Sequence, residues 1–253
     1  MDGVQYKTGL LMFLLGFSTG SFYKTGLDLA ESIEVIRKLD CRALELGLVK
    51  NQQEFLSGEL QHLDPEVLNG FEYVSLHAPL IDYRNNEETR KILREIAVLS
   101  KKFFLDLVVF HPDLVYDFSL LDGVGFNVAL ENMDRRKARF KVPTDFEKLL
   151  AAHPEWQLVL DVNHIKTNDP TMKLAKEFYE RFPYRLSQIH LSGYVSSHEP
   201  LYQTEQREVL EAIQDFDVPV IVESVVAIDK IDDEFRYILH AIEKITEARG
   251  LHQ

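Results

Sequence analysis

Residues 126–133, Phe-Asn-Val-Ala-Leu-Glu-Asn-Met, form a short apolar run that ends abruptly in Glu131 and Asn132. Short apolar runs of this kind are typical of strands that are buried on both faces of a parallel sheet. A carboxylate at the end of such a strand needs a partner, because an unpaired buried charge is costly. We therefore predict a buried strand that delivers Glu131 to a site shared with other residues.

The same ending recurs in five further apolar runs along the chain. The residues at the ends of these runs are His77, His111, Asp161, His190 and Glu223. Histidine and carboxylate side chains are common ligands of metal ions. We predict that Glu131 is the bridge that ties these ligands into one site.

The apolar runs alternate with helical segments. Two earlier strands are predicted at 10–17 and 43–48, and helical segments at 27–39, 52–68, 87–101, 144–152, 171–182, 205–214 and 232–248. Eight strands alternating with about eight helices, at a period of about 30 residues, predict an α/β chain that folds as one (β/α)8 TIM barrel domain over 1–253. An open doubly wound sheet would need a glycine-rich phosphate loop after an early strand, and the sequence has none.

One connection of the predicted barrel is unusual. Only 20 residues separate His111 from Glu131, whereas 29 to 34 residues separate the other successive strand-end residues from Glu45 to Glu223. We therefore expect the fourth helix to be short or distorted.

The composition narrows the class of protein. Of the 253 residues 45% are hydrophobic, enough for a sizeable core, and the net charge of −13 argues against a non-specific nucleic-acid binder unless a local basic patch exists. Cys41 is the only cysteine, which excludes a disulfide framework and fits a reducing cytoplasm. The apolar run at 9–17 faintly resembles a signal peptide, but it is too short to span a bilayer and the barrel needs a strand there. We expect a cytoplasmic protein without a membrane partner.

The candidate metal ligands all follow predicted strands. They are His77, His111, Glu131, Asp161, His164, His190, His198 and Glu223. A single histidine in such a place is usually a hydrogen-bonded core residue, but so many on the face of a barrel that carries active sites favour a metal centre. The converging carboxylates would repel one another unless cations neutralised them.

The ligand types indicate which metals and how many. Imidazole and carboxylate without thiolate suit Zn²⁺, Mn²⁺ or Fe²⁺. Eight potential ligands exceed the three or four protein ligands of one catalytic zinc, so we predict at least two ions with a bridging carboxylate. Two ions ~3.5–4 Å apart can activate a water and steady the leaving oxygen of a phosphoryl displacement.

A basic loop follows the bridging residue. Residues 134–141 read Asp-Arg-Arg-Lys-Ala-Arg-Phe-Lys, and five of these eight residues are basic. We predict that Arg135 and Arg136 bind a substrate phosphate, with Lys166 and Tyr194 as further candidates. A solvated surface loop that balances nearby acids is the alternative. Glu45 also ends a strand, but burial beside an arginine would explain it equally well.

The ordered set of motifs resembles the xylose-isomerase-like TIM barrels, a superfamily that includes endonuclease IV and the sugar isomerases and epimerases. The motifs are Glu45-Leu46, His77-Ala78-Pro79, His111-Pro112, Glu131-Asn132, Asp161-x-x-His164, His190-Leu191 and Glu223, together with the opening Gly16-Phe17-Ser18-Thr19-Gly20. The resemblance covers nearly the whole chain, and it implies a metal-dependent enzyme.

Resemblance to endonuclease IV implies three zinc ions. His77, His111 and Glu131 match the ligands of one zinc; Glu131, Asp161, His190 and Glu223 match the second; His164 and His198 match two of three ligands of the third. The chain departs from that pattern at two positions. Ser196 stands where an aspartate ligand of the third zinc is expected, and Leu80 stands in the region of a tyrosine used on DNA.

Resemblance to the epimerases implies a single metal ion. Its ligands would be Glu131, Asp161, His190 and Glu223. The two glutamates of this set would move the proton from opposite faces of a sugar. An arginine that the epimerases often carry after the histidine of the seventh strand is absent. A one-metal site would also leave His77, His111 and His198 without a role, which favours the multinuclear interpretation.

We therefore expect a divalent-metal-dependent phosphoester hydrolase with two or three zinc ions, acting on a sugar phosphate or on a nucleic acid with an abasic site. The alternative is a sugar or sugar-phosphate isomerase or epimerase that uses Glu131 and Glu223 as acid and base, with one Mn or Co ion. A non-catalytic barrel or another metal-dependent activity, such as an oxygenase, also stays open, as does a homodimer.

Overall fold

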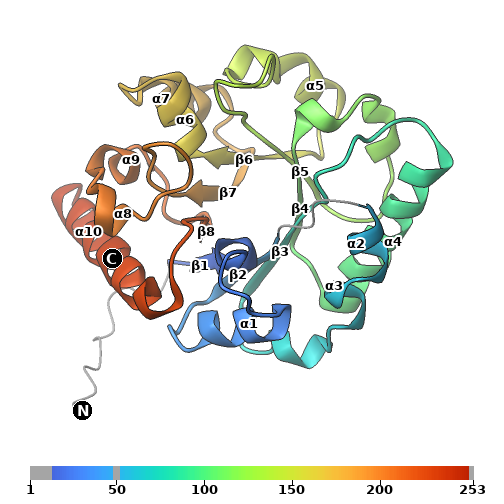
Figure 1. The fold of residues 1–253 in the computed structure, drawn as a ribbon. Coiled ribbons are helices and arrows are strands. Elements are labelled where there is room, and N and C mark those ends of the chain that lie inside the picture. The colour runs from blue at the N-terminus through green and yellow to red at the C-terminus, as the bar shows by residue number, and fades with distance from the viewer. Residues whose placement is uncertain (1–12, 48–51, 251–253) are drawn as a thin grey trace.

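Eight parallel strands close into a barrel in the computed structural model, which describes residues 13–47 and 52–250 (Figure 1). The strands are β1 Leu15–Ser18, β2 Ala43–Leu46, β3 Tyr73–His77, β4 Leu107–Phe110, β5 Val128–Glu131, β6 Gln157–Asp161, β7 Leu186–Leu191 and β8 Val220–Val222. Each strand pairs with its neighbour in sequence, and β1 pairs with β8 to close the ring. The prediction of a (β/α)8 barrel is confirmed. Positions 10–12 and 48 of the first two predicted strands lie outside the described residues.

Helices surround the barrel on all sides (Figure 1). The α-helices are α1 Leu29–Arg37, α2 Gln52–Ser57, α3 Glu59–His62, α4 Glu87–Phe103, α5 Glu147–Ala152, α6 Val162–Asn168, α7 Lys173–Arg181, α8 Leu201–Thr204, α9 Arg207–Glu211 and α10 Ile231–Ala248. Short 3-10 helices are η1 Thr19–Phe22, η2 Pro65–Leu68, η3 Pro112–Leu114, η4 Phe118–Leu121, η5 Pro143–Asp145 and η6 Ile228–Lys230. Only η3 and η4 lie between β4 and β5, so the short fourth connection is also confirmed.

Local sequence signals explain where the helices begin and end. The amide N–H of Glu31 donates to the Asp28 side chain at 2.8 Å and the Glu31 side chain accepts from the Asp28 amide at 3.0 Å, which is a capping box at the start of α1. The helices differ from the prediction in two ways. The segment 52–68 is broken into α2, α3 and η2, with Gly58 between the first two, and α6 and α8 were not predicted at all.

The strands have two different faces. Alternate residues point outward and join the large core between barrel and helices, including Leu44, Leu76, Val108, Leu130 and Leu160. The intervening residues Leu107, Val109, Ala129 and Val159 form a small second cluster, with Tyr73 against it. Since successive side chains of a strand face opposite sides, this second cluster fills the barrel interior. The barrel interior is therefore apolar near β4 to β6. The next inward-facing positions of these strands, two residues further along the chain, are His111, Glu131 and Asp161.

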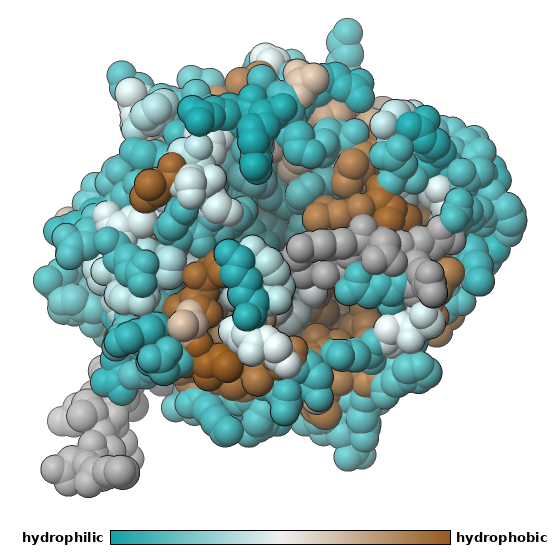
Figure 2. Space-filling view, in the orientation of Figure 1, coloured by the Kyte–Doolittle hydropathy of each residue, from teal (hydrophilic) through white to brown (hydrophobic). Residues whose placement is uncertain are grey.

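The surface is mixed in character. Figure 2 shows a mostly hydrophilic surface with hydrophobic residues in several patches around the middle of this face. Among the helices of the described residues, none has the length and apolar character needed to cross a membrane.

Candidate metal centre

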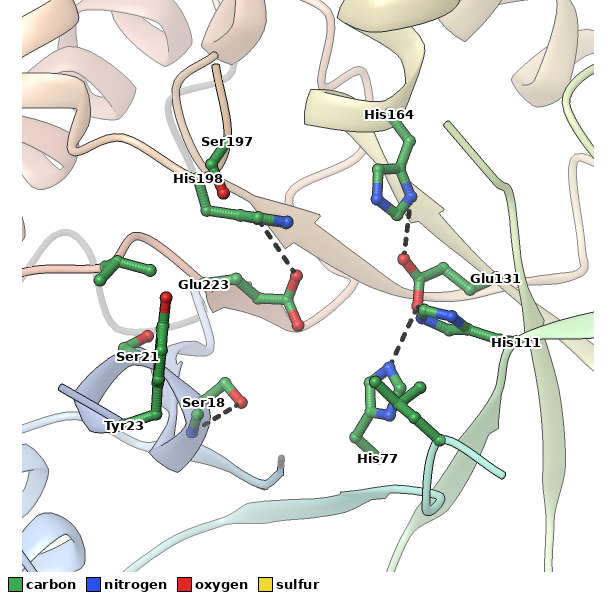
Figure 3. A pocket seen from close by; sticks show the side chains of 13 residues that line it. Ser18, Ser21, Tyr23, His77, His111, Glu131, His164, Ser197, His198 and Glu223 are labelled. Carbon is green, nitrogen blue, oxygen red and sulfur yellow. Dashed lines mark hydrogen bonds and ion pairs between the residues drawn. The ribbon is translucent and has the colours of Figure 1, made fainter. Parts of the chain in front are cut away.

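A pocket of about 230 Å³ lies at the C-terminal ends of the strands. Its lining residues are Ser18, Gly20, Ser21, Tyr23, His77, Leu80, His111, Glu131, His164, Ser197, His198, Glu223 and Val225. In Figure 3 the hydroxyl groups of Ser18, Ser21 and Tyr23 stand on one side of the pocket, and Glu131 stands on the other with the imidazoles of His77, His111 and His164. The pocket is therefore asymmetric, with one wall of neutral donors and one wall of metal-type ligands.

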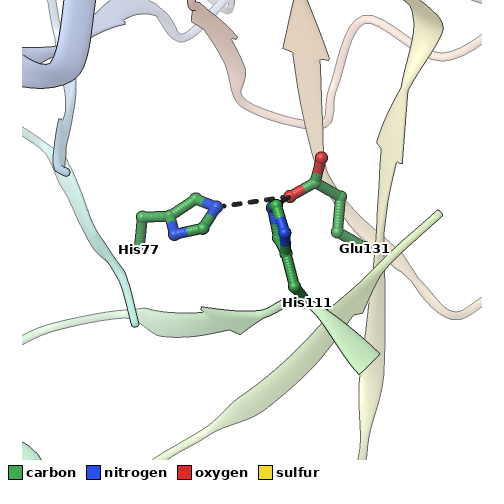
Figure 4. Close-up of side chains that lie close together, drawn as sticks. All are labelled: His77, His111 and Glu131. Carbon is green, nitrogen blue, oxygen red and sulfur yellow. Dashed lines mark ion pairs between the residues drawn. The ribbon is translucent and has the colours of Figure 1, made fainter. Parts of the chain in front are cut away.

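The first ligand group joins the ends of β3, β4 and β5. The Nε2 atoms of His77 and His111 lie 3.4 and 3.3 Å from the same oxygen, Oε2 of Glu131. Figure 4 shows the two rings pointing toward that carboxylate from adjacent strands, with their centroids 4.8 Å apart. Nδ1 of His77 lies 3.1 Å from the carbonyl oxygen of Ala78, which leaves Nε2 to face Glu131. A backbone contact of this kind is how metal-binding histidines are commonly oriented.

The second ligand group shares Glu131 with the first. Nδ1 of His190 lies 3.5 Å from Oε2 of Glu131 and 3.5 Å from Oε1 of Glu223. Glu131, Asp161 and His190 each offer one atom to a common position, with these atoms all within 4.8 Å of one another. Glu131 thus stands between two sets of ligands, the position that a bridging carboxylate requires.

Among the described residues, three buried atoms of the second group make no hydrogen bond, although each lies 3.3 to 3.5 Å from a side chain of opposite type. They are Oε2 of Glu131, Oδ2 of Asp161 and Nδ1 of His190. A buried polar atom without a partner is expensive, and such atoms call for an explanation such as an ion. Because the three atoms are an anionic oxygen pair and an imidazole nitrogen that converge, their chemistry fits a divalent cation.

His164 and His198 lie at the edge of this arrangement. Nδ1 of His164 lies 2.7 Å from the carbonyl oxygen of Asn132 and 3.1 Å from Oε1 of Glu131. Nδ1 of His198 lies 3.0 Å from Oγ of Ser192 and 3.8 Å from Oε2 of Glu223. The two rings are 6.0 Å apart.

In the loop after β7, position 196 carries a serine in place of the carboxylate that was expected near His198. The Ser196 hydroxyl donates to the Glu199 side chain at 2.7 Å, and that side chain also accepts from the backbone amides of Val195 and Ser197 at 2.8 and 3.0 Å. Glu199 therefore holds the loop together, and the expected third carboxylate ligand has no substitute there.

Opposing charges hold the pocket together electrostatically. Burial raises the pKa of Asp161 to about 6 and that of Glu223 to about 7. Burial acts the same way on Glu131, but the charges of His111 and His190 outweigh it and hold the pKa of Glu131 well below its ordinary value. The neighbouring carboxylates in turn outweigh burial and raise the pKa of His77 to about 9 and that of His164 to about 10, whereas burial lowers the pKa of His111. Protons on His77 and His164 thus balance the carboxylates, and a bound cation would take their place.

Glu45 is buried against His190 and Gln188. It is completely buried, and its Oε2 lies 3.0 Å from Nε2 of His190 and 2.7 Å from the side-chain nitrogen of Gln188. Of the two explanations that the sequence left open for Glu45, the structure shows burial beside His190 at the site and no pairing with an arginine among the described residues. The sequence could not reveal the true partner, because His190 lies 145 residues further along the chain.

The four predicted phosphate-binding residues do not line the pocket. Arg136 pairs with Asp134, and Nζ of Lys166 lies 2.8 Å from Oε1 of Glu208. The guanidinium of Arg135 lies 5.9 Å from the ring centre of Tyr194. Lys166 is therefore engaged elsewhere, while Arg135 and Tyr194 form a pair outside the lining.

Sequence reasoning missed the opposite wall of the pocket. Ser18, Ser21 and Tyr23 line it, and the side chain of Tyr23 is half exposed. Ser18 belongs to the motif at 16–20, and Ser21 and Tyr23 follow it without forming a motif of their own. The signal that could have found them is the cluster of hydroxyl residues directly after the first strand, because that is the face of a barrel where sites form.

Comparison with known proteins adds the structural class. The chain matches no protein-family model, and no curated protein matches its sequence. Among solved structures, endonuclease IV from Thermus thermophilus is similar with a TM-score of 0.65 at 18% identity, over 92% of this chain and 99% of that one. D-psicose 3-epimerase is similar with a TM-score of 0.65 at 11% identity, over 91% and 98% of the two chains. A xylose isomerase domain containing protein from Salmonella typhimurium has a TM-score of 0.65 at 13% identity, over 95% and 100%.

These likenesses show that the chain shares the (β/α)8 barrel fold of the three proteins. They extend over nearly the full length of each chain compared. At such low identities they show the fold alone, since one fold hosts many activities. What the chain does must therefore be argued from the site.

Proposed function

We propose that the protein is a divalent-metal-dependent phosphoester hydrolase with two metal ions, most simply zinc. The observation that carries the proposal is the position of Glu131, whose Oε2 faces His77 and His111 on one side and His190 on the other. Two ions bound there would supply Lewis acidity and activate a water for attack on phosphorus. Nitrogen and oxygen donors without a thiolate suit zinc among the common metals.

The number of ions follows from the ligands. His77, His111 and Glu131 provide one set, and Glu131, Asp161 and His190 provide another, with Glu223 beside it. A third ion would rely on His164 and His198 without a carboxylate from position 196, where the chain has serine. Two ions therefore fit the described residues better than three.

The pocket favours a compact substrate. Its volume of about 230 Å³ suits a phosphorylated sugar or a single sugar taken out of a nucleic acid. The net charge of −13 disfavours broad contact with the backbone of a duplex. On the wall opposite the ligands, the Ser18 hydroxyl accepts from the amide of Gly20 at 3.3 Å and can donate to a sugar hydroxyl or a phosphate oxygen, whereas the Ser21 hydroxyl already donates to the carbonyl oxygen of Val222 at 3.2 Å. We therefore place a small sugar phosphate first among the substrates.

The test begins with the metal content of the purified protein. We expect about two equivalents of zinc, and hydrolysis of a sugar phosphate or of abasic DNA that stops on chelation and returns with added zinc. Glu131→Gln should remove the activity and lower the metal content, whereas His240→Gln on the exposed face of α10 should change neither. Zinc-loaded protein that hydrolyses neither kind of substrate would sink the proposal.

A second candidate function is a sugar or sugar-phosphate epimerase. The observation that favours it is the placement of Glu131 and Glu223, two carboxylates that both lie 3.5 Å from the same atom of His190 and line one pocket. Such a pair can take a proton from one face of a sugar carbon and return it on the other. Exchange of a sugar proton with deuterated water, with one equivalent of Mn or Co, would favour this candidate over hydrolysis.

A further inference from the structure

Glu45 occupies an unusual place for a carboxylate. It is completely buried in β2, on the inward side of a barrel that is ordinarily filled by branched apolar side chains. Its Oε2 accepts hydrogen bonds from Gln188 at 2.7 Å and from Ser75 at 3.2 Å, and it lies 3.0 Å from Nε2 of His190. Well-packed apolar residues are often at least as stabilising as buried ionic groups. A carboxylate at this position therefore calls for a role that an apolar side chain cannot fill.

The neighbouring hydrogen bonds fix the orientation of Gln188. The hydroxyl of Tyr73 donates to Oε1 of Gln188 at 2.9 Å, which leaves the amide nitrogen facing Glu45. A flipped amide would place its oxygen 2.7 Å from a carboxylate oxygen, where the two would repel each other. The chain Tyr73–Gln188–Glu45 thus has one consistent arrangement.

The charge of Glu45 favours one position for the proton of the His190 ring. Nε2 of His190 faces the carboxylate of Glu45 at 3.0 Å and the amide nitrogen of Gln188 at 2.7 Å. The carboxylate can only accept and the amide nitrogen can only donate, so Nε2 cannot bond with both. A charged acceptor makes the stronger hydrogen bond, which favours a proton on Nε2, with Nε2 and the amide of Gln188 both donating to Oε2 of Glu45. Nδ1 is then the nitrogen whose lone pair a cation can use, and among the described residues this buried atom has no hydrogen-bond partner.

We propose that Glu45 is a positioning residue for the metal centre: it holds the proton on Nε2 of His190 and so presents Nδ1 to a divalent cation shared with Glu131 and Asp161. The inference rests on the metal centre of the proposed function, but it concerns the binding of the metal and not the reaction. Carboxylates that orient metal-binding histidines in this way also raise the basicity of the ring.

The first test uses the unaltered protein. Protein labelled with ¹⁵N in its histidines is loaded with zinc, and a long-range ¹H–¹⁵N spectrum assigns the proton and the metal on each ring. The signals of His190 are those that disappear in His190→Asn. We expect a protonated Nε2 and a metal-bound Nδ1. A metal on Nε2 with the proton on Nδ1 would overturn the proposal.

The second test is the variant Glu45→Gln, titrated with zinc alone in a calorimeter. We expect one of the two ions to bind about 10- to 100-fold more weakly, because the oriented ring loses its charged partner. The other ion, held by His77 and His111, should bind as before. Ser75→Ala is the matched control, since it removes only the longest hydrogen bond to Glu45 and should leave both affinities within a few-fold of wild type.

The outcomes separate the alternatives. A purely structural role would lower the unfolding temperature of Glu45→Gln without a selective effect on one ion, and unchanged affinity for both ions would likewise overturn the proposal. If the variant does not fold, the spectrum of the unaltered protein decides. Neither test uses a substrate, so a protein that binds zinc as expected but hydrolyses no phosphoester would contradict the proposed function and leave the role of Glu45 intact.

Discussion

The side chain of Asn132 forms two hydrogen bonds with the backbone of Asp161. Its Nδ2 donates to the carbonyl oxygen at 3.0 Å, and its Oδ1 accepts from the amide N–H at 2.7 Å. The carbonyl oxygen of Asn132 itself lies 2.7 Å from Nδ1 of His164. Since Asn132 also follows Glu131 directly in the chain, one buried residue sets the relative positions of three candidate ligands.

We predict that Asn132→Ala lowers the free energy of unfolding by about 1–3 kcal/mol, because two buried backbone groups of Asp161 lose their partner. Zinc should also bind more weakly, since Asp161 and Glu131 are no longer held in register. Urea unfolding of the metal-free protein and zinc calorimetry measure the two effects. Asn85→Ala on the surface is the control and should change stability by about 0.5 kcal/mol or less. Equal stability of the two variants would contradict this role for Asn132.

The two ligand groups can be tested separately. We predict that His77→Asn removes one of two bound zinc equivalents and abolishes phosphoester hydrolysis, because the ring is a ligand of one group only. Metal analysis and a hydrolysis assay on the same sample measure this. The control is His62→Asn at an exposed position, which should change neither the metal content nor the hydrolysis. Loss of one metal with full retention of a sugar epimerase activity would instead favour the one-metal candidate function.

The barrel could be predicted from the sequence because its signals are local and repeated. Each buried strand is a short apolar run, and six of the eight runs end in a histidine or carboxylate that marks the same face, as at His77 and Glu131. The short connection before β5 followed from the spacing alone. The helix α6 was missed because it begins immediately after Asp161, which serves as its N-cap by accepting from the amide of His164 at 2.8 Å.

The partners of the site residues could not be predicted in the same way. Contacts such as Glu45 with His190 depend on how strands far apart in the chain face one another across the barrel interior, and no local pattern in the sequence encodes such a pairing.

The basic loop at 134–141 is visible in the sequence, but its partners are not. A run of cations is visible in the sequence, but whether a cation is free depends on neighbours such as Asp134, which binds Arg136. A count of charges therefore identifies candidate phosphate-binding residues, but it does not show which of them are available to bind a phosphate.

The single cysteine gives a prediction about pH. Cys41 is buried, and burial, together with the charge of Asp40, raises the pKa of its thiol well above the ordinary value of 9.0. The folded protein therefore keeps the thiol neutral at a pH where the unfolded chain ionises it. Stability from this group is complete below the ordinary pKa and falls as the pH rises above it, by up to about 1.4 kcal/mol per pH unit.

Urea unfolding on either side of that pKa measures this slope, and Cys41→Ala should flatten it. The same burial predicts that a thiol reagent labels the native protein slowly and the unfolded protein at once. Rapid labelling of the native protein would show that Cys41 is accessible and that the slope has another source.

Arg135 and Arg136 are adjacent but differ in their surroundings. Asp134 binds the guanidinium of Arg136, with Nε at 2.9 Å from Oδ2, whereas Arg135 has no ion pair among the described residues. We therefore predict that Arg135→Ala raises KM for a phosphate-bearing substrate about tenfold, the equivalent of ~1.4 kcal/mol, with kcat unchanged. Arg136→Ala should have a smaller effect on KM, and Arg139→Ala none. Steady-state kinetics on the three variants measure this order. If Arg135→Ala leaves KM unchanged, the loop is ordinary solvated surface and the phosphate is bound by the hydroxyl wall of the pocket instead.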